Sequence, residues 1–472
     1  MLAHESSWAS EPKMSTRNTM IYSVTLRLVI QFDIACTLPR AIDGTMFMTA
    51  SHPIAAAPTE PQSPSAAIDA VCAHLDPLDS ESIPLAHSSG RVLAEVVRAD
   101  RASPALDMSS MDGFAVRVAD LNEMASTTGL PIATGADSEA SIGHAPVSMQ
   151  PGRAIRIVTG APIPIGADAV VRHEDVRIAN GCALLQIAAS AVQPGAFIRR
   201  EGENALKGAG ILQPGTLIGA ASIGALATFG AASVRVQRRV RIAIITTGDE
   251  LVTTDRTPAP WQIRDSNGSV LASLLGGRPW IEVVAHLHAK DDADALATTL
   301  AMALESADAV IVTGGVSMGH HDHVPQVVSR LGAATVFHRL PQRPGRPMLA
   351  AVLPRTGSRA PRLILGLPGN PVSVMVTARR LGIPMLGKLA GLPHGQFTAP
   401  RLHTDGDDGA QLGMWWFRLV SERISAEGER RLQLLPTKSS GDIAAAATSI
   451  GFVEVAPHQS AAGANAFYSW MH

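Results

Sequence analysis

Between residues 239 and 380 the chain alternates between two hydrophobic patterns. Near-continuous runs of Val, Ile and Leu that end at Gly, Thr or Pro are typical of strands buried on both faces. Segments with apolar residues at helical spacing follow them. This alternation predicts a doubly wound α/β domain, whose parallel sheet is covered on both faces. The strand runs are VRIAIITT, WIEVVAHLHA, DAVIVT and RLILGL, and the helical segments are DSNGSVLASLLGG, ADALATTLAMALES and VSVMVTARRL.

The flanking regions have different patterns. Residues 65–75 have helical periodicity, and residues 208–230 predict a second helix that ends at a glycine. Residues 98–207 contain short alternating runs separated by Gly and Pro, which predict a β-rich unit. After residue 396, the runs WWFRLV, RRLQLLP and GFVEVAP are separated by turn signals and predict a small β domain.

The chain of 472 residues is long enough for about three or more domains. We predict a multidomain protein of the α/β plus β class, with a β-rich domain inserted into an elongated linking domain. The predicted division is an unstructured extension over 1–58, a linking domain over 59–98 with 206–235, the β-rich domain over 99–205, the α/β domain over 236–393 and a C-terminal β domain over 394–472.

The N-terminal extension does not have the pattern of a targeting segment. Its most apolar part, residues 20–41, is interrupted by Arg27 and Asp33 and is not followed by a clear cleavage site. The Ala, Pro and Ser-rich tract that comes next has the composition of a flexible lead-in, and Met46 and Met48 just before it are alternative starts of translation. We therefore expect no membrane association and a cytoplasmic protein.

Charge and cysteine content narrow the functional classes. The formal net charge is −2, without a dense block of Lys and Arg, so the chain lacks the electrostatic pattern of a nucleic-acid-binding protein. The three cysteines, Cys36, Cys72 and Cys182, are scattered and form no CxxC motif. This spacing argues against a disulfide framework or a structural zinc site and favours a reducing compartment. A small-molecule or protein partner is expected.

Acidic residues follow the predicted strands. Because ligands of an open parallel sheet bind beyond the carboxyl ends of the strands, the residues at those ends are candidates for chemistry. Glu250 and Asp291 come directly after two strands, and Asp322 follows closely after a third. Such acids are also ordinary helix caps, but several carboxylates on one rim would repel without a cation between them. The pattern favours Mg²⁺, held by these three residues, and hence a phosphate-bearing substrate.

Residues suited to an anion lie at the same predicted edge. Gly314 and Gly315 allow backbone N–H groups to approach a ligand. Asn370 and Pro371 resemble the N-cap and first position of a helix, while Arg343 and Arg346 in QRPGRP add two fixed positive charges. None of these loops is a Walker A or GxGxxG motif, so neither a nucleotide-hydrolysing P-loop nor a dinucleotide site is supported.

The segment VTGGVSMGHHDH allows two interpretations. His320, His321 and His323 could bind a transition metal, but such close neighbours cannot easily point at one ion. We expect exposed or hydrogen-bonded histidines, with Asp322 as the functional member.

Eight motifs, in this order, show a family resemblance: SSMDGFAV, IVTGAPIPIGADAVV, VRIAIITTGDEL, RDSN, AKDD, VTGGVSMGHHDH, QRPGRP and LPGNPVS. Together they resemble the molybdopterin molybdenumtransferases, the MoeA family, which includes the E domain of gephyrin. The α/β part alone also resembles the MogA-like molybdopterin adenylyltransferases. Those proteins lack the first two motifs.

The resemblance implies an activity and its partners. Such proteins insert molybdate into adenylylated molybdopterin and release AMP with the help of Mg²⁺. They are homodimers in which the β-rich domain of one subunit completes the pocket of the other, and the molybdopterin adenylyltransferase is a potential protein partner. Two alternatives stay open, an adenylyltransferase and a dimeric scaffold for a membrane receptor. Residue types alone do not decide between molybdate and tungstate.

The resemblance also implies residue roles. The catalytic set is Asp112, Thr159, Glu250, Asp291 and Asp322. Asn204 stands where the family often has an acid, which argues against a metal role there, and Met108 stands where Asn is usual. The substrate-binding set is Gly314, Gly315, Ser317, Arg343, Arg346, Pro368, Asn370 and Pro371.

Overall fold

The computed structural model describes residues 60–121, 128–135, 138–317, 319, 322–355, 357, 359–406, 408–425 and 428–471. The predicted extension over 1–58, and His320 and His321, lie outside these residues. In the described part of the chain, no helix is long and apolar enough to cross a membrane.

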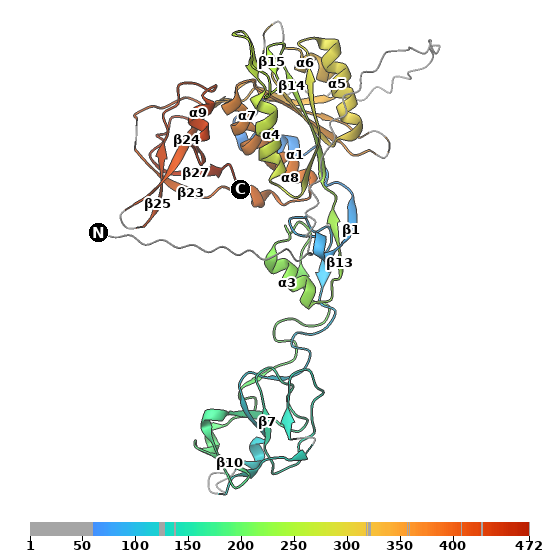
Figure 1. Cartoon of the computed structure of the whole chain (residues 1–472), viewed down its shortest axis with the longest axis vertical. Helices are drawn as coiled ribbons and strands as arrows, with labels where there is room; N and C mark the ends of the chain where they lie inside the picture. Colours follow the sequence, from blue (N-terminus) through green and yellow to red (C-terminus); the bar gives the residue numbers. More distant parts are fainter. Residues whose placement is uncertain are drawn as a thin grey trace, which may run out of the picture. The chain divides into compact units, whose positions relative to one another are not determined.

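A six-stranded sheet forms the centre of the predicted α/β region (Figure 1). Its order is β17-β14-β18-β22-β21-β19, and the first four strands are parallel, as predicted. The expectation of a parallel sheet was incomplete at one side, because β19 and β21 were not predicted and β21 is antiparallel to both of its neighbours. The segments that join β21 to β19 and β22 are too short for a crossover helix, so these strands pair antiparallel. The strands are β14 (Val240–Thr247), β17 (Ile281–Ala289), β18 (Ala309–Thr313), β19 (Ala334–His338), β21 (Leu349–Leu353) and β22 (Arg362–Leu367).

Helices cover both faces of this sheet, which explains the near-continuous apolar strands. Along β14, Ile242 and Ile244 pack into one hydrophobic cluster, whereas Ala243 and Ile245 pack into the other. Figure 1 shows α5 and α6 on one side of β14, and α4, α7 and α8 on the other. Helix α1 packs in the same cluster as α4, α7 and α8, so it adds to the cover of this sheet. The helices are α1 (Pro64–Cys72), α4 (Ser266–Gly276), α5 (Ala293–Ser306), α6 (Val324–Arg330), α7 (Pro371–Thr377) and α8 (Ile383–Leu389), with a π-turn, η6 (Ala378–Gly382), between the last two.

Short polar side chains start several of these helices. Asp265 accepts a hydrogen bond from the Gly268 N–H (3.0 Å) at the start of α4. Asp292 accepts one from the Ala295 N–H (2.8 Å) at the start of α5. These bonds satisfy donors that the first helical turn leaves unpaired. Asn370 occupies the N-cap position of α7, as predicted, but its side chain makes no capping bond.

The predicted β-rich region contains two small sheets. The first has the order β6-β7-β4-β8 and the second the order β5-β10-β9. Phe114 and Val171 are buried between them with Leu185. The strands are β3 (Met108–Ser109), β4 (Gly113–Val116), β5 (Leu130–Pro131), β6 (Glu139–Ala140), β7 (Ile155–Ile157), β8 (Ala169–Arg172), β9 (Val176–Ala179), β10 (Cys182–Leu185) and β11 (Ile198–Arg199), with the short helices η2 (Val118–Asp120), η4 (His173–Asp175) and η5 (Ala189–Ala191).

The chain enters and leaves this region through paired strands. β2 (Val97–Arg98) pairs with β12 (Gly210–Leu212), and β1 (Ser80–Pro84) pairs with β13 (Ser233–Gln237). The predicted helix before residue 230 is α3 (Ala220–Thr228), and Gly230 follows it at a positive φ of 80°. The predicted domain boundaries stay a prediction. The packing of α1 favours grouping residues 64–72 with the α/β sheet.

The C-terminal region is a small closed barrel. Its strand order is β20-β24-β25-β23-β27-β26, and a further pairing of β24 with β26 closes the ring. Val453 and Phe467 belong to the cluster of the barrel interior, whereas Phe452, stacked on Tyr468 and edge-on to Phe417, packs with Val376 of α7. Strand β20 (Gln342–Arg343) belongs to the QRPGRP motif, so this motif joins the barrel to the α/β region. The other strands are β23 (Arg401–Asp405), β24 (Trp415–Ile424), β25 (Arg430–Leu434), β26 (Gly451–Val455) and β27 (Gly463–Ser469), with η7 (His394–Phe397) before the barrel and α9 (Ile443–Ala447) within it.

Candidate functional site

Two glycine turns meet at the carboxyl edge of the central sheet. Gly314 and Gly315 follow β18 with φ angles of 90° and 63°, a region that favours glycine. A Cβ on Gly314 would lie 2.5 Å from the Thr247 Oγ1, so no side chain fits there. The Gly314 N–H donates to the Leu367 carbonyl (3.0 Å), and the Gly314 Cα lies 3.9 Å from where a Cβ on Gly369 would be. The turn after β18 and the LPGNP turn after β22 are therefore in contact, as the sequence predicted for one shared edge.

A cavity of about 720 Å³ opens beside the LPGNP turn. Arg343, Arg346, Pro368 and Asn370, all predicted for substrate binding, line it together with Lys438. We call this cavity the basic cleft. Within the described residues, the side chains of Arg343, Arg346 and Lys438 form no ion pair, so their charges are available to an anion. The other polar side chains of the lining are Gln342, Ser373, Asp408, Arg418, Thr437, Ser439 and Ser440.

The barrel contributes a wall of the basic cleft that the sequence did not predict. The Asn370 Nδ2 donates to the Ser440 Oγ (2.9 Å), and the Val372 N–H donates to the Ser440 carbonyl (3.1 Å). The segment TKSSGD has a helix-start pattern, and Asp442 does cap α9. That pattern gives no sign that the segment contacts α7, because the contact joins residues that are distant in the chain.

One positive charge of the cleft is already neutralised. Arg418 forms two hydrogen bonds with the Asp408 carboxylate (2.8 and 2.5 Å) and lies over the Trp416 ring, 4.2 Å from its centroid. Arg418 therefore braces the barrel wall, whereas Arg343, Arg346 and Lys438 are left for a ligand.

The acids at the carboxyl edge are tied to backbone groups. The Asp249 N–H donates to the Asp291 carboxylate and the Asp291 N–H to the Asp249 carboxylate, both at 3.4 Å. The Glu250 carboxylate folds back over Gly248, within 2.6 Å of where a Cβ would be. The loops after β14 and β17 are thus joined, and Asp249, which the sequence reasoning did not select, is the partner of Asp291.

Asp322 lies at the start of α6. Its Oδ2 accepts a hydrogen bond from the Gly319 N–H (2.5 Å), and its own N–H donates to the Gly319 carbonyl (3.1 Å). His323 occupies the N-cap position of α6 without a capping bond from its side chain. Ser317 is exposed beside this turn.

The described residues contain no group of three or more His, Cys, Asp or Glu side chains arranged to hold a metal ion. The structure therefore does not gather Glu250, Asp291 and Asp322 into one ready cluster. Their chemistry still suits Mg²⁺, which prefers oxygen ligands and commonly binds one or two carboxylates together with waters and substrate phosphates. The joined pair of Asp249 and Asp291 fits that smaller requirement.

Two buried polar atoms near the edge have no hydrogen-bond partner among the described residues. They are the Oδ1 of Asn267 and the Oγ1 of Thr313. The Asn267 Nδ2 donates to the Gly369 carbonyl (2.7 Å), so this side chain of α4 holds the LPGNP turn in place. Unpartnered buried acceptors and donors are costly unless a ligand or water satisfies them. The RDSN motif therefore contributes Asn267 to the candidate site, a residue that the sequence reasoning did not select.

Asp265 of the same motif is a hydrogen-bonding centre. Its carboxylate accepts hydrogen bonds from the Thr246 Oγ1 (2.9 Å) and the Gly268 N–H (3.0 Å), and the His286 Nε2 lies 3.2 Å away. Burial acts to raise the pKa of Asp265, but the hydrogen bonds from His286, Gly268 and Thr246 together outweigh it and lower the pKa. This carboxylate stays charged and fixes the first turn of α4 against β14.

Asp112 and Thr159 form a pair in the β-rich region. The Asp112 Oδ1 accepts a hydrogen bond from the Thr159 N–H (2.6 Å), which lowers the pKa of this carboxyl group. The pair forms because β4 and β7 align Gly113 with Ile157, next to these two residues. Both side chains are exposed, and neither lines the basic cleft.

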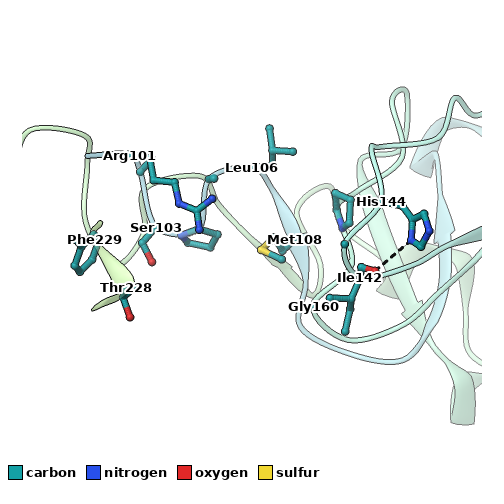
Figure 2. Close-up of a pocket in the computed structure, with 14 residues that line it drawn as sticks. Arg101, Ser103, Leu106, Met108, Ile142, His144, Gly160, Thr228 and Phe229 are labelled. Carbon is teal, nitrogen blue, oxygen red and sulfur yellow. Dashed lines mark hydrogen bonds between the residues drawn. The ribbon is translucent and has the colours of Figure 1, made fainter. Parts of the chain in front are cut away.

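A second cavity, of about 430 Å³, lies along the segment that enters the β-rich region. Figure 2 shows Arg101, Thr228 and Phe229 toward one end and Ile142 and His144 toward the other. Among the described residues, no acidic side chain lines this cavity, whereas Met108 does, as do Gly160 and Pro162 of the IVTGAPIPIGADAVV motif.

Asn204 joins the two chain segments that enter and leave the β-rich region. Its Nδ2 donates to the Ser103 Oγ (3.3 Å), and its Oδ1 accepts from Arg199 (2.9 Å). Met108 pairs with Arg199 across β3 and β11. Both departures from the family pattern therefore lie where these two segments are held together, and the Asn204 side chain has hydrogen-bond partners in both.

Comparison with known proteins gives two profile matches. Residues 62–230 match the MoeA N-terminal region (domain I and II), and residues 243–388 match the probable molybdopterin binding domain.

Several curated relatives have the same name. The molybdopterin molybdenumtransferase of Nostoc sp. is 38% identical over 339 residues, covering 70% of this chain and 75% of the relative. That of Synechocystis sp. is 30% identical over 411 residues, covering 86% and 99%. The crystal structure of the molybdopterin biosynthesis MoeA protein from Pyrococcus horikoshii has a TM-score of 0.69 at 24% identity, covering 86% of this chain and 99% of that one. This likeness confirms the predicted fold class along most of the chain.

Proposed function

Because the chain belongs to the molybdopterin molybdenumtransferase (MoeA) family, we propose that it inserts molybdate into adenylylated molybdopterin, releasing AMP and molybdenum cofactor. The observation that carries the proposal is the basic cleft, which unites three unpaired cations with the LPGNP turn. A molybdopterin adenylyltransferase is not favoured, because the match over residues 62–230 adds a MoeA N-terminal region to the α/β domain.

The basic cleft would bind the anionic parts of the substrates. Arg343 and Arg346 present planar guanidinium groups that suit oxyanions such as phosphate and molybdate, and Lys438 adds a compact charge from the barrel wall. Asn370 holds that wall in place through Ser440. The substrate would therefore be fixed by groups already in position before it binds, which lowers the entropic cost of reaching the reactive geometry.

We propose that Mg²⁺ on the substrate phosphates would be held by acids of the carboxyl edge. These are Asp291, whose loop is bonded to that of Asp249, together with Glu250 and Asp322. The ion would neutralise charge that develops on the leaving phosphate. The residues of the basic cleft would orient the phosphates and keep them in one position. The substrate-binding roles of Gly314, Gly315, Ser317, Pro368 and Pro371 belong to the same proposal.

Catalysis would rely on positioning and electrostatics rather than on a covalent intermediate. Of the described cysteines, Cys72 lies in α1, and burial raises the pKa of its thiol to about 11. A thiol with so high a pKa is protonated at neutral pH and is a poor nucleophile. Cys182 lies in β10 of the β-rich region.

A second copy of the chain would complete each site with its Asp112–Thr159 pair. This part of the proposal is supported by the separation of that pair from the lining of the basic cleft. It makes a prediction for mixed dimers of two inactive variants, Asp112→Asn and Asp322→Asn. Random mixing should restore about a quarter of the wild-type activity, because half of the dimers then contain one intact site of two. Two variants that stay inactive after mixing would show that both residues act within one chain.

The direct test is AMP release from adenylylated molybdopterin with Mg²⁺ and molybdate. Stoichiometric AMP that depends on molybdate supports the proposal, and its absence contradicts it. Consumption of ATP without molybdate would instead indicate an adenylyltransferase. In the proposed pathway, a separate molybdopterin adenylyltransferase in the cytoplasm would supply the adenylylated substrate. Co-purification of the two proteins would test this partnership.

A further inference from the structure

An exposed tryptophan stands on the loop between β15 (Leu251–Val252) and β16 (Ile263–Arg264). Trp261 exposes 77% of its surface, and Ile263, two residues later, exposes 57%. An indole ring is large and mostly apolar, so leaving it in water forgoes most of the stabilisation that its burial could give. An indole ring that is exposed to this extent is available to stack on a planar ligand.

The backbone on both sides of Trp261 is fixed. The Gln262 N–H donates to the Ala259 carbonyl (2.8 Å), and the Gln262 Oε1 accepts from the Ala259 N–H (3.2 Å). Pro258 and Pro260 restrict the φ angles just before the tryptophan. The end of the loop is thus a closed turn, and Trp261 lies inside it. A rigid turn lowers the entropic cost of using the indole as a binding surface.

The strand register places this turn beside the acids of the carboxyl edge. β15 and β16 pair in parallel, with Leu251 opposite Ile263, and the Ile263 N–H donates to the Glu250 carbonyl (2.9 Å). Trp261 comes two residues before Ile263 in the chain, and Asp249 comes directly before Glu250, so the turn that carries the indole adjoins the loop of these two acids. Asp249 is the residue whose loop is bonded to Asp291. The turn with the exposed indole is therefore joined, through Ile263 and Glu250, to the part of the edge where the substrate phosphates are proposed to bind.

We infer that Trp261 is a positioning residue that stacks on a fused heteroaromatic ring of the substrate. The inference rests on the proposed function, because adenylylated molybdopterin contains two such rings, the pterin and the adenine, on either side of its phosphates. Stacking of a base on an aromatic side chain contributes enough to change an affinity by about tenfold. The contact would select substrates with a planar ring at the correct distance from the phosphates, without taking part in bond breaking.

The test compares Trp261→Ala, Trp261→Phe and the control Ile263→Ala, which shortens an exposed side chain at the start of β16. In AMP release, Trp261→Ala should raise KM by about tenfold with kcat within about twofold, because stacking acts on binding. Trp261→Phe should restore most of the loss, since a smaller aromatic face remains. Ile263→Ala should behave as the wild type. An unchanged KM in Trp261→Ala, or a phenylalanine variant as weak as the alanine variant, would overturn the inference.

Equilibrium binding separates this inference from the proposed function. AMP and molybdopterin are titrated separately into each variant, which needs no turnover. Weaker AMP binding in Trp261→Ala assigns the contact to the adenine, and weaker molybdopterin binding assigns it to the pterin. Unchanged binding of both compounds overturns the stacking role even if AMP release is observed. A wild-type protein that binds both through Trp261 but releases no AMP would contradict the proposed activity alone.

Discussion

The basic and the acidic sides of the carboxyl edge differ in how complete they are. Arg343, Arg346 and Lys438 line one cavity and have no ion pair within the described residues, so the basic side is assembled in the chain by itself. On the acidic side, the carboxylates of Asp291 and Asp322 accept hydrogen bonds from backbone N–H groups. No three acids gather there in the described part of the chain.

This difference indicates an order of assembly. The cations of the basic cleft already line one cavity, whereas the described acids form no cluster of three that could hold a metal, so a Mg²⁺ ion there needs further oxygen ligands. Substrate phosphates supply such ligands in many magnesium sites. The comparison therefore predicts that anion binding precedes tight cation binding, and that changes on the two sides affect different steps.

The largest effect is expected from Asp322→Asn. The amide oxygen can still accept the hydrogen bond from Gly319, so the turn should persist, but the negative charge is lost. AMP release should fall by about a hundredfold or more, while substrate binding stays nearly unchanged, since the basic cleft is intact. The control is Asp294→Asn on α5, an exposed acid paired with Arg330. Equal turnover in wild type and Asp322→Asn would show that the Asp322 carboxylate does not assist AMP release.

A smaller effect on a different step is expected from Arg343→Gln combined with Arg346→Gln. Substrate affinity should fall by about tenfold to a hundredfold, because two charge-assisted hydrogen bonds to an oxyanion are lost. Calorimetric titration of the substrate measures this directly. Arg355→Gln is the matched control, an exposed arginine that pairs only loosely with Asp76 (3.5 Å). If the double variant binds as the wild type does, the substrate does not use the basic cleft.

A pH titration distinguishes Asp112 from an ordinary surface acid. The Thr159 N–H lowers the pKa of Asp112 below its usual value of 3.8. Because the folded pKa is lowered, the favourable contribution of this carboxylate is present above the unfolded pKa and is lost as pH falls through the folded pKa. NMR titration should therefore give a midpoint below 3.8, and Thr159→Ala should raise it only partly, since the backbone bond remains. A midpoint at or above the usual value would disprove the hydrogen bond in solution.

The smallest effect is expected from Asn204→Asp, which restores the acid usual in the family. In the variant the Ser103 hydroxyl can donate to the carboxylate instead of accepting from the amide, and an exposed ion pair with Arg199 is gained, so the free energy of unfolding should change by less than about 1 kcal/mol. AMP release should stay within about twofold. Chemical denaturation and the AMP assay measure the two quantities. A severalfold change in turnover would show that this position affects the chemistry and not only the strand contacts.

The sequence was most informative where local pattern determines structure. Helix α5 covers the segment ADALATTLAMALES from end to end, and four of the six strands of the central sheet, β14, β17, β18 and β22, were predicted with it. The antiparallel direction of β21 was not predicted, because strand direction depends on pairing between segments rather than on the spacing of apolar residues.

The same limit applies to the candidate site. Arg343, Arg346, Pro368 and Asn370 were predicted from neighbouring motifs, and they line one cavity. Lys438 and Ser440 were not, since their place beside α7 follows from the packing of the barrel. Asn267 was quoted only as part of a motif, and its unpartnered oxygen becomes visible only in three dimensions. Composition and spacing identify residue types well, but they do not give long-range neighbours.

Binding of Mn²⁺, a spectroscopic substitute for Mg²⁺, tests the order of assembly most directly. Electron paramagnetic resonance measures free Mn²⁺ during titration of the wild-type protein, with and without adenylylated molybdopterin. Binding should be weak for the protein alone and at least about tenfold tighter with the substrate, whose phosphates complete the ligand set. Equal affinity in both titrations would contradict the proposal that the substrate completes the cation site.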